Sequence, residues 1–281
     1  MFGKKKPALA APGDRIRVTA REIGNFEPPP RTTLSGDLAD ARYVVPAGGH
    51  LVVDGVRAKQ VDFSGLHVWA LAVIGSSFEQ CDFSDLRCDS VPSFGAGASS
   101  LYRNCHFDRM KLVRFSPGVS RFEGCTFDGV EIRDARIELA EFVDCTFSGL
   151  ITDAVFSGTP YESGAKFLHP PRLRNEFRGN DFSRCGIRGV DFVNGIDVEQ
   201  QRWPVGPDYV LMDRVPERLR AFRALVERWP DGPKRAEALF LCERFSDWPR
   251  YGNAMFVQKT SFSVSPQYSD EIWGLLQSAI D

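Results

Sequence analysis

Histidine, which commonly serves in catalytic and metal sites, is scarce in this chain of 281 residues, and its positions are scattered. The chain contains four histidines, and none is spaced from cysteine or carboxylate as a metal site requires: His50, His67, His106 and His169. A phosphate-binding loop, a dinucleotide fingerprint and a nucleophile elbow are all missing. These absences predict a protein that is not an enzyme and that holds neither a cofactor nor a metal.

Long apolar runs and an excess of one charge are also missing. The longest runs, such as 68–75, are far shorter than the ~20 residues that cross a membrane. The basic start, Lys4–Lys6, is not followed by the apolar segment of a signal peptide. With a net charge of −2, no general attraction to nucleic acid is expected. We therefore expect a cytoplasmic protein that contacts neither membrane nor nucleic acid directly.

Phenylalanine, in contrast, is abundant, with 22 residues, and many of them fall in a period of five. In the clearest stretch every fifth residue is apolar, and the residue two before it is small or apolar: Phe122, Phe127, Ile132, Ile137, Phe142 and Phe147. Neither an α-helix, with 3.6 residues per turn, nor a simple strand, with period two, produces this spacing. Each unit of five residues must therefore turn one corner of a coil.

The period also separates an inside from an outside. We assign the central residue of each unit, and the residue two before it, to the interior over 61–88, 100–152 and 175–192. None of these positions is Asp, Glu, Lys or Arg, although such residues make up 26% of the chain. Because a buried charge without compensation costs several kcal/mol, this exclusion indicates a core that runs along the repeats.

A longer period of twenty residues indicates four sides per coil. Similar six-residue segments begin at Tyr102, Phe122 and Phe142, and the related segments at Phe78 and Phe177 are displaced by extra residues. The extra residues lie near 89–100 and within 154–175. We predict that both insertions are loops that leave the coil at a corner.

Several units resemble the consensus of the pentapeptide-repeat family, namely Cys81–Asp85, Cys125–Gly129 and Cys145–Gly149. The resemblance covers about half of the chain and implies a mainly β fold, a right-handed four-sided parallel β-helix. We assign this β-helix to 36–197. Pro117 at a central site, and Asn175 and Asn180 at small-residue sites, depart from the consensus and put the local coil in doubt.

The predicted core consists of stacked columns of identical side chains, one from each coil. Its named members are five phenylalanines and four cysteines: Phe83, Phe107, Phe127, Phe147, Phe182, Cys81, Cys105, Cys125 and Cys145. Rungs about 4.8 Å apart would allow the thiols to form a disulfide or to hold a soft metal. The alternative is that cysteine serves as a small apolar filler, and we favour it because no histidine or carboxylate occupies an inward position.

The two ends of the chain differ from the repeats. Residues 1–35 are interpreted as a loose leader and an N-terminal edge segment, with a short β-like run at Ile16–Val18. Residues 198–281 show helical spacing, with helices expected at about 215–229, 234–247 and 269–280 and with Asp213 as an N-cap. These helices are predicted to form a cap on the last coil, or, as the alternative, a separate module that binds a partner.

Outward charges are banded along the repeats. Basic residues dominate 102–121, whereas acidic residues dominate 122–163 and include Glu123, Asp128, Glu131, Asp134, Glu138, Glu141 and Asp144. This acidic band could dock a basic partner, or the bands could alternate so that neighbouring coils form weak ion pairs. Trp69, at an outward position, is a second candidate for a contact surface.

Three hypotheses for function follow. The first is a non-enzymatic scaffold that binds an unidentified protein partner through its outer faces and corner loops. The second comes from the resemblance, since some pentapeptide-repeat proteins are homodimers that mimic DNA and protect DNA gyrase. A net charge of −4 over 56–200 is low for such a mimic. The third is an enzyme at the insertion 154–175, where Tyr161, His169 and Arg172 would lie.

Overall fold

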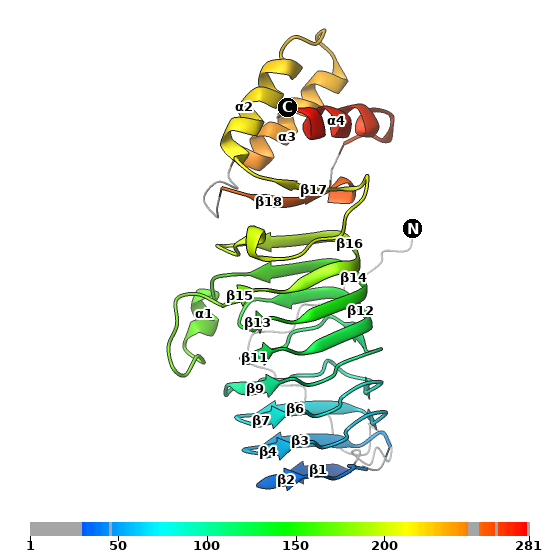
Figure 1. Cartoon of the computed structure of the whole chain (residues 1–281), viewed down its shortest axis with the longest axis vertical. Helices are drawn as coiled ribbons and strands as arrows, with labels where there is room; N and C mark the ends of the chain where they lie inside the picture. Colours follow the sequence, from blue (N-terminus) through cyan, green and yellow to red (C-terminus); the bar gives the residue numbers. More distant parts are fainter. Residues whose placement is uncertain (1–29, 45–46, 247–252, 262–263, 280–281) are drawn as a thin grey trace, which may run out of the picture.

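The protein is an elongated stack of parallel β-rungs with helices at its C-terminal end (Figure 1). The structure is a computed structural model, and it describes residues 30–44, 47–246, 253–261 and 264–279. The run Ile16–Val18 and the rest of 1–29 lie outside the described residues. None of the described helices is long and apolar enough to cross a membrane.

Three parallel sheets form the walls of the rod. The longest contains seven strands: β2 (Asp37–Ala39), β4 (Arg57–Lys59), β7 (Ser77–Glu79), β9 (Ser100–Arg103), β11 (Ser120–Glu123), β13 (Glu141–Val143) and β15 (Phe177–Arg178). The second contains β10 (Lys111–Val113), β12 (Thr126–Ile137), β14 (Thr146–Ser157) and β16 (Asp181–Val193). The third contains β1 (Arg31–Leu34), β3 (His50–Asp54) and β6 (Ala70–Ile74), and the short strands β5 (His67–Val68) and β8 (Arg87–Cys88) pair separately.

The register between rungs follows the twenty-residue period. Phe122 lies opposite Tyr102 on one side and opposite Phe142 on the other, and Ile132 lies opposite Leu112. Within one coil, Phe122, Phe127, Ile132 and Ile137 all point inward and are at most 1% exposed. The predicted four-sided parallel β-helix is therefore confirmed.

Aromatic rings stack in columns along the interior, and each coil contributes one ring to a column. In one column the ring of Phe127 lies 5.0 Å from that of Phe107 and 4.8 Å from that of Phe147, and the rings are nearly parallel. The nine named core residues, five phenylalanines and four cysteines, are each at most 3% exposed. Because every ring contacts one ring above and one below, the core couples neighbouring coils.

The first insertion does not simply leave the coil, as the sequence suggested. Phe94 is 1% exposed, and its ring packs edge-on against Tyr102 and Phe107. Its carbonyl accepts a hydrogen bond from the Tyr102 hydroxyl at 2.8 Å. The hydrophobic gain from burying this ring explains why part of the insertion 89–100 turns back into the lumen.

The inward frame also shifts by one residue at Gly149. Leu150, assigned to the interior from the period, is 38% exposed, whereas Ile151 is fully buried opposite Ile132. Gly149 has a φ of +102°, and a Cβ there would lie 2.2 Å from the Val130 carbonyl oxygen. Glycine thus permits a close approach that shortens this coil by one residue.

Beyond Cys145, the column of cysteines continues as hydrogen-bonded side-chain amides. Asn180 accepts a hydrogen bond from the Cys145 backbone N–H at 3.0 Å and donates to the Phe142 carbonyl at 2.9 Å. Gln201 follows one rung later and accepts from Asn180 at 3.0 Å. The Trp203 ring stacks on Phe182 at 5.3 Å, so the interior columns extend beyond residue 197. The helix η1 (Val198–Gln200) lies in this last partial coil.

An antiparallel ribbon of β17 (Tyr209–Met212) and β18 (Met255–Gln258) joins the solenoid to the helices. Phe256 stacks on Trp203 at 4.3 Å, and the Gln258 amide bonds both the N–H and the carbonyl of Val190. Gln258 therefore satisfies backbone groups that would otherwise be exposed at the open edge of β16. Met255 and Val257, which alternate with these residues, face the helices.

The helical region has a core of its own, built from α2 (Val215–Val226), α3 (Pro233–Ser246) and α4 (Pro266–Ser278). A short helix, η3 (Lys259–Ser261), follows β18. The expected N-cap at Asp213 is wrong, because Arg214 occupies that position without a side-chain cap. The Asp213 carboxylate instead accepts hydrogen bonds from Arg218, which keeps it away from the helix N–H groups. The predicted C-terminal helical cap region is confirmed.

Candidate interaction surface

Most outward charges on the sheets pair from one coil to the next. Representative pairs are Lys59 with Glu79 at 2.9 Å and Arg103 with Glu123 at 2.7 Å. Such exposed pairs each contribute about 0–1 kcal/mol, but together they neutralise the surface locally. The alternating charge bands seen in the sequence therefore correspond to ladders of ion pairs.

The acidic band divides into paired and unpaired carboxylates. Five of its members bond cations of this chain: Glu123 to Arg103 and Arg121, Asp128 to Arg184, Glu131 to Lys111, Glu141 to Arg121 and Arg172, and Asp144 to Arg178. Within the described part of the chain, Asp134 and Glu138 make no ion pair. A partner that approached the paired carboxylates would have to compete with these internal contacts.

Trp69 lies in a different part of the rod, just before β6. Its side chain is 45% exposed, and its ring stacks on that of His50 at 4.7 Å. The structure therefore does not bring Trp69 together with the acidic band, and these two predicted contact surfaces are separate.

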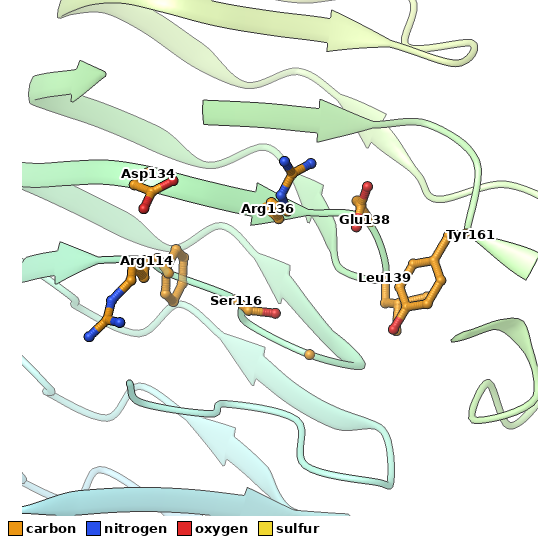
Figure 2. A pocket seen from close by; sticks show the side chains of 9 residues that line it. Arg114, Ser116, Asp134, Arg136, Glu138, Leu139 and Tyr161 are labelled. Atoms are coloured by element: carbon orange, nitrogen blue, oxygen red, sulfur yellow. The ribbon is translucent and has the colours of Figure 1, made fainter. Parts of the chain in front are cut away.

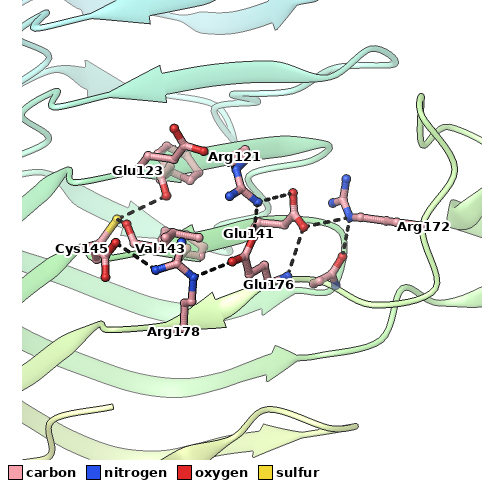
Figure 3. A network of polar contacts seen from close by, with 12 residues as sticks. Arg121, Glu123, Glu141, Val143, Cys145, Arg172, Glu176 and Arg178 are labelled. Atoms are coloured by element: carbon pink, nitrogen blue, oxygen red, sulfur yellow. Dashed lines mark hydrogen bonds and ion pairs between the residues drawn. The ribbon is translucent and has the colours of Figure 1, made fainter. Parts of the chain in front are cut away.

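The second insertion, predicted at 154–175, begins later, because Ala154 and Phe156 continue β14 and are buried. It forms an excursion, residues 158–176, between β14 and β15, and carries the short helix α1 (Glu162–Ala165) (Figure 1). A buried carboxylate anchors its C-terminal end (Figure 3). Glu141, whose side chain is 10% exposed, pairs with Arg172 at 3.4 Å and accepts a hydrogen bond from the Glu176 backbone N–H at 3.1 Å. Arg121 joins the network at 3.2 Å from Glu141 and 2.8 Å from Glu176.

Neighbouring arginines lower the pKa values of two carboxylates in this network, Glu123 and Glu176. A hydrogen bond from Arg178 holds the pKa of Glu176 below its ordinary value, with further help from Arg121. Burial opposes ionisation of Glu123, but hydrogen bonds from Arg103 and Arg121 outweigh it and lower its pKa. Burial also lowers the pKa of Arg172, in part offset by the Glu141 charge. The arginines thus favour the charged forms of Glu123 and Glu176.

Apolar and amide contacts fix the rest of the excursion. Leu168 is 1% exposed and packs with Val119 and Leu139 on the side of the solenoid. Asn175 donates from its amide to the carbonyls of Glu138 and Ser157, both at 2.9 Å. Asn175, which departs from the repeat consensus, therefore ties the C-terminal end of the excursion to two coils.

Although it is held in this way, the excursion exposes large apolar side chains. Leu173 is 89% exposed and Phe167 is 43% exposed, with the Lys166 ammonium 5.0 Å from the centre of the Phe167 ring. Of the three residues that the enzyme hypothesis placed here, Arg172 is engaged by Glu141, while Tyr161 and His169 are exposed. Sequence reasoning missed Phe167 and Leu173, whose only signal is that they are apolar and lie outside the repeat frame.

The cysteines are all free thiols, and six of the seven are buried. In the column, the Cys125 thiol donates to the Tyr102 carbonyl at 3.4 Å, and the Cys145 thiol donates to that of Val143 at the same distance. Among the described residues, no group of three or more His, Cys, Asp or Glu is arranged to hold a metal ion.

These thiols are expected to react slowly in the folded protein. Burial raises the pKa of Cys185 to about 12 and that of Cys242 to about 11, and it raises the pKa of Cys125 as well. Since the thiolate is the reactive form, an aromatic disulfide reagent at pH 8 should label the native thiols slowly, beginning with the half-buried Cys88. All seven should react rapidly in denaturant. Fast native labelling of Cys125, located by peptide mapping, would contradict this expectation.

No protein-family model and no curated protein matches this chain. Among solved structures, it is similar to full-length QnrB1, a plasmid-mediated fluoroquinolone resistance protein, with 15% identity and a TM-score of 0.22 over 62% of this chain and 92% of that one. Two trypsin-treated QnrB1 variants show 13% and 15% identity, TM-scores of 0.27 and 0.22, and coverage of 60% and 59% of this chain and 89% and 77% of theirs. Likeness at this level carries no argument about function, and the fold rests on the rungs described above.

Proposed function

We propose that this protein is a non-enzymatic scaffold, a β-solenoid that binds a protein partner through the excursion 158–176. One observation carries the proposal: the excursion is held by buried contacts of Glu141, Leu168 and Asn175, yet it exposes Phe167 and Leu173. Loops positioned by a rigid scaffold often carry function, and exposed apolar side chains in such loops are typical anchors for a partner.

The surroundings of these anchors indicate the kind of partner. Lys166 and Arg174 are exposed beside them. Of the two carboxylates in the excursion, Glu162 is exposed, whereas Glu176 is paired with Arg121 and Arg178. A complementary partner surface would offer an apolar pocket with carboxylates at its rim. The absence of disulfides among the cysteines fits a reducing compartment, and we propose a cytoplasmic location.

The alternatives have less support. A DNA mimic needs a continuous negative face, but five carboxylates of the acidic band are paired with cations of the same chain. An effect of the purified protein on gyrase supercoiling would restore that hypothesis. An enzyme at the excursion would need convergent groups, whereas Arg172 is held by Glu141 as part of the anchor.

The proposal predicts that partner capture depends on the two exposed anchors. The double variant Phe167→Ser and Leu173→Ser should capture the partner at least about tenfold less than the parent protein, since anchor residues often contribute ~2 kcal/mol each. A matched control is Val113→Ser with Leu150→Ser, which removes side chains 37% and 38% exposed on another face. Affinity capture followed by quantitative mass spectrometry measures both. Equal capture by the excursion variant and the control would refute the proposal.

A further inference from the structure

A cavity of about 340 Å³ opens on the side of the solenoid beside the start of the excursion. Its walls come from two successive coils and from Tyr161, and the side chains that matter most are Arg114, Asp134, Arg136, Glu138, Leu139 and Tyr161. Figure 2 shows Arg114 and Asp134 toward one end of the cavity and Leu139 and Tyr161 toward the other. Charged groups therefore line the cavity along its length, whereas Leu139 and Tyr161 lie at one end, next to Glu138.

The backbone creates this cavity. Pro117 has no N–H to donate, and the chain after it lies against the coil below, where the Val119 N–H donates to the Gly95 carbonyl at 2.9 Å. A Cβ on Gly118 would lie 2.4 Å from the Gly95 carbonyl oxygen, so glycine permits this approach. On the other side, the Arg136 N–H donates to the Phe115 carbonyl at 2.9 Å. In the described part of the chain this is the last backbone hydrogen bond between residues 115–119 and the coil above. The gap that follows is the cavity, so it exists before any ligand arrives.

The charges around the cavity are not part of the ladders of ion pairs. Lys111 and Glu131, at the preceding face, pair at 3.8 Å, as the ladders do elsewhere. In contrast, the charged groups of Arg114, Asp134, Arg136 and Glu138 make no ion pair with any described residue. Two cations and two carboxylates are thus available at one cavity, and ligand sites typically combine apolar walls with a few such polar groups.

We propose that this cavity binds a small aromatic zwitterion, of which an aromatic α-amino acid is the simplest example. The ligand carboxylate would bond Arg114, and its ammonium would bond Asp134, which lies at the same end of the cavity (Figure 2). Its ring would lie between Leu139 and Tyr161, whose faces offer apolar and aromatic contact. This activity goes beyond the proposed function and does not depend on a protein partner.

Three probes test whether both charges are needed: L-phenylalanine, phenethylamine, which lacks the carboxylate, and 3-phenylpropionate, which lacks the ammonium. In calorimetry or saturation-transfer NMR with the full chain, phenylalanine should bind, and each analogue should bind about tenfold more weakly. Equal binding of the three probes, or no binding of phenylalanine up to about 10 mM, would overturn the proposal.

Variants locate the binding. Ser116→Trp should fill the cavity and abolish binding of phenylalanine, and Arg114→Asn should weaken it about tenfold. Asparagine suits this position because Arg114 has a φ of +54°, which asparagine tolerates. Arg133→Gln, which removes a charge next to Asp134 in β12 but outside the cavity lining, should leave binding unchanged. Binding by Arg114→Asn as tight as by the parent, or a loss in Arg133→Gln equal to that in Arg114→Asn, would contradict the assignment. The partner capture described above is unaffected by either result.

Discussion

Phe127→Ala should destabilise the protein by about 3–5 kcal/mol, because it empties a site in a column that the rest of the core cannot refill. The Phe127 ring stacks on Phe107 and Phe147 at 5.0 and 4.8 Å and packs edge-on against Phe122 at 5.6 Å. The Phe142 ring is tilted against it at 5.8 Å, so deletion of the Phe127 ring removes contacts to four rings in three coils. In a solenoid, where each coil is stabilised by its neighbours, it also weakens the coupling between the two halves of the rod.

Urea unfolding followed by circular dichroism measures this effect. The control is Glu131→Ala in the same strand, because Glu131 is outward and its pair with Lys111 is long, at 3.8 Å, and exposed. That variant should lose at most about 1 kcal/mol. Equal losses in the two variants would contradict the arrangement of inward and outward positions.

Arg121→Gln should cost roughly 3 kcal/mol, the second largest effect that we expect. The guanidinium lies within 3.2 Å of Glu141, 2.8 Å of Glu176 and 2.5 Å of Glu123. Its loss would leave the buried Glu141 with Arg172 as its remaining cation, and three carboxylates would face one another. A matched control is Arg178→Gln, which also pairs with Glu176, at 2.6 Å, but is 49% exposed and should cost at most about 1 kcal/mol.

The effect of Arg121→Gln should depend on pH. Because the pKa values of Glu123 and Glu176 are lowered in the folded protein, their contribution is present above their unfolded pKa of 4.5 and is lost as pH falls through the folded values. The difference in free energy of unfolding between parent and variant should thus be largest near neutral pH and shrink toward pH ~3. Urea midpoints at both pH values test this, and a difference that grows on acidification would contradict the proposed network.

The sequence predicted the solenoid because its signal is repeated in every coil. The alternation of charged and apolar positions around Phe127 or Phe147 follows directly from one side of each unit being buried. The positions of Phe94 and Leu150 could not be read in this way. A period predicts which residues of the regular units face the interior. The burial of Phe94 depends instead on space in the lumen, and the exposure of Leu150 depends on a close backbone approach at Gly149.

The candidate site was less accessible to sequence reasoning. Glu131 and Glu141 look alike in the repeat, yet Glu141 is buried under the excursion while Glu131 is exposed, because only the former meets residues that return to it from positions 172–176. Phe167 and Leu173 lie outside the frame, so the period says nothing about them. Phe256 of the ribbon stacks on Trp203, a residue more than fifty positions away, and no repeat in the sequence signals this contact.

The central claim is that a protein partner contacts the excursion and not the paired faces of the sheets. Photo-crosslinking tests it most directly, with a photoreactive phenylalanine analogue placed singly at Phe167, Leu173, Val113 or Leu150. We predict one discrete protein adduct from positions 167 and 173 and none from 113 and 150. Adducts of equal yield from all four positions, or adducts only from 113 and 150, would show that the excursion is not the docking site.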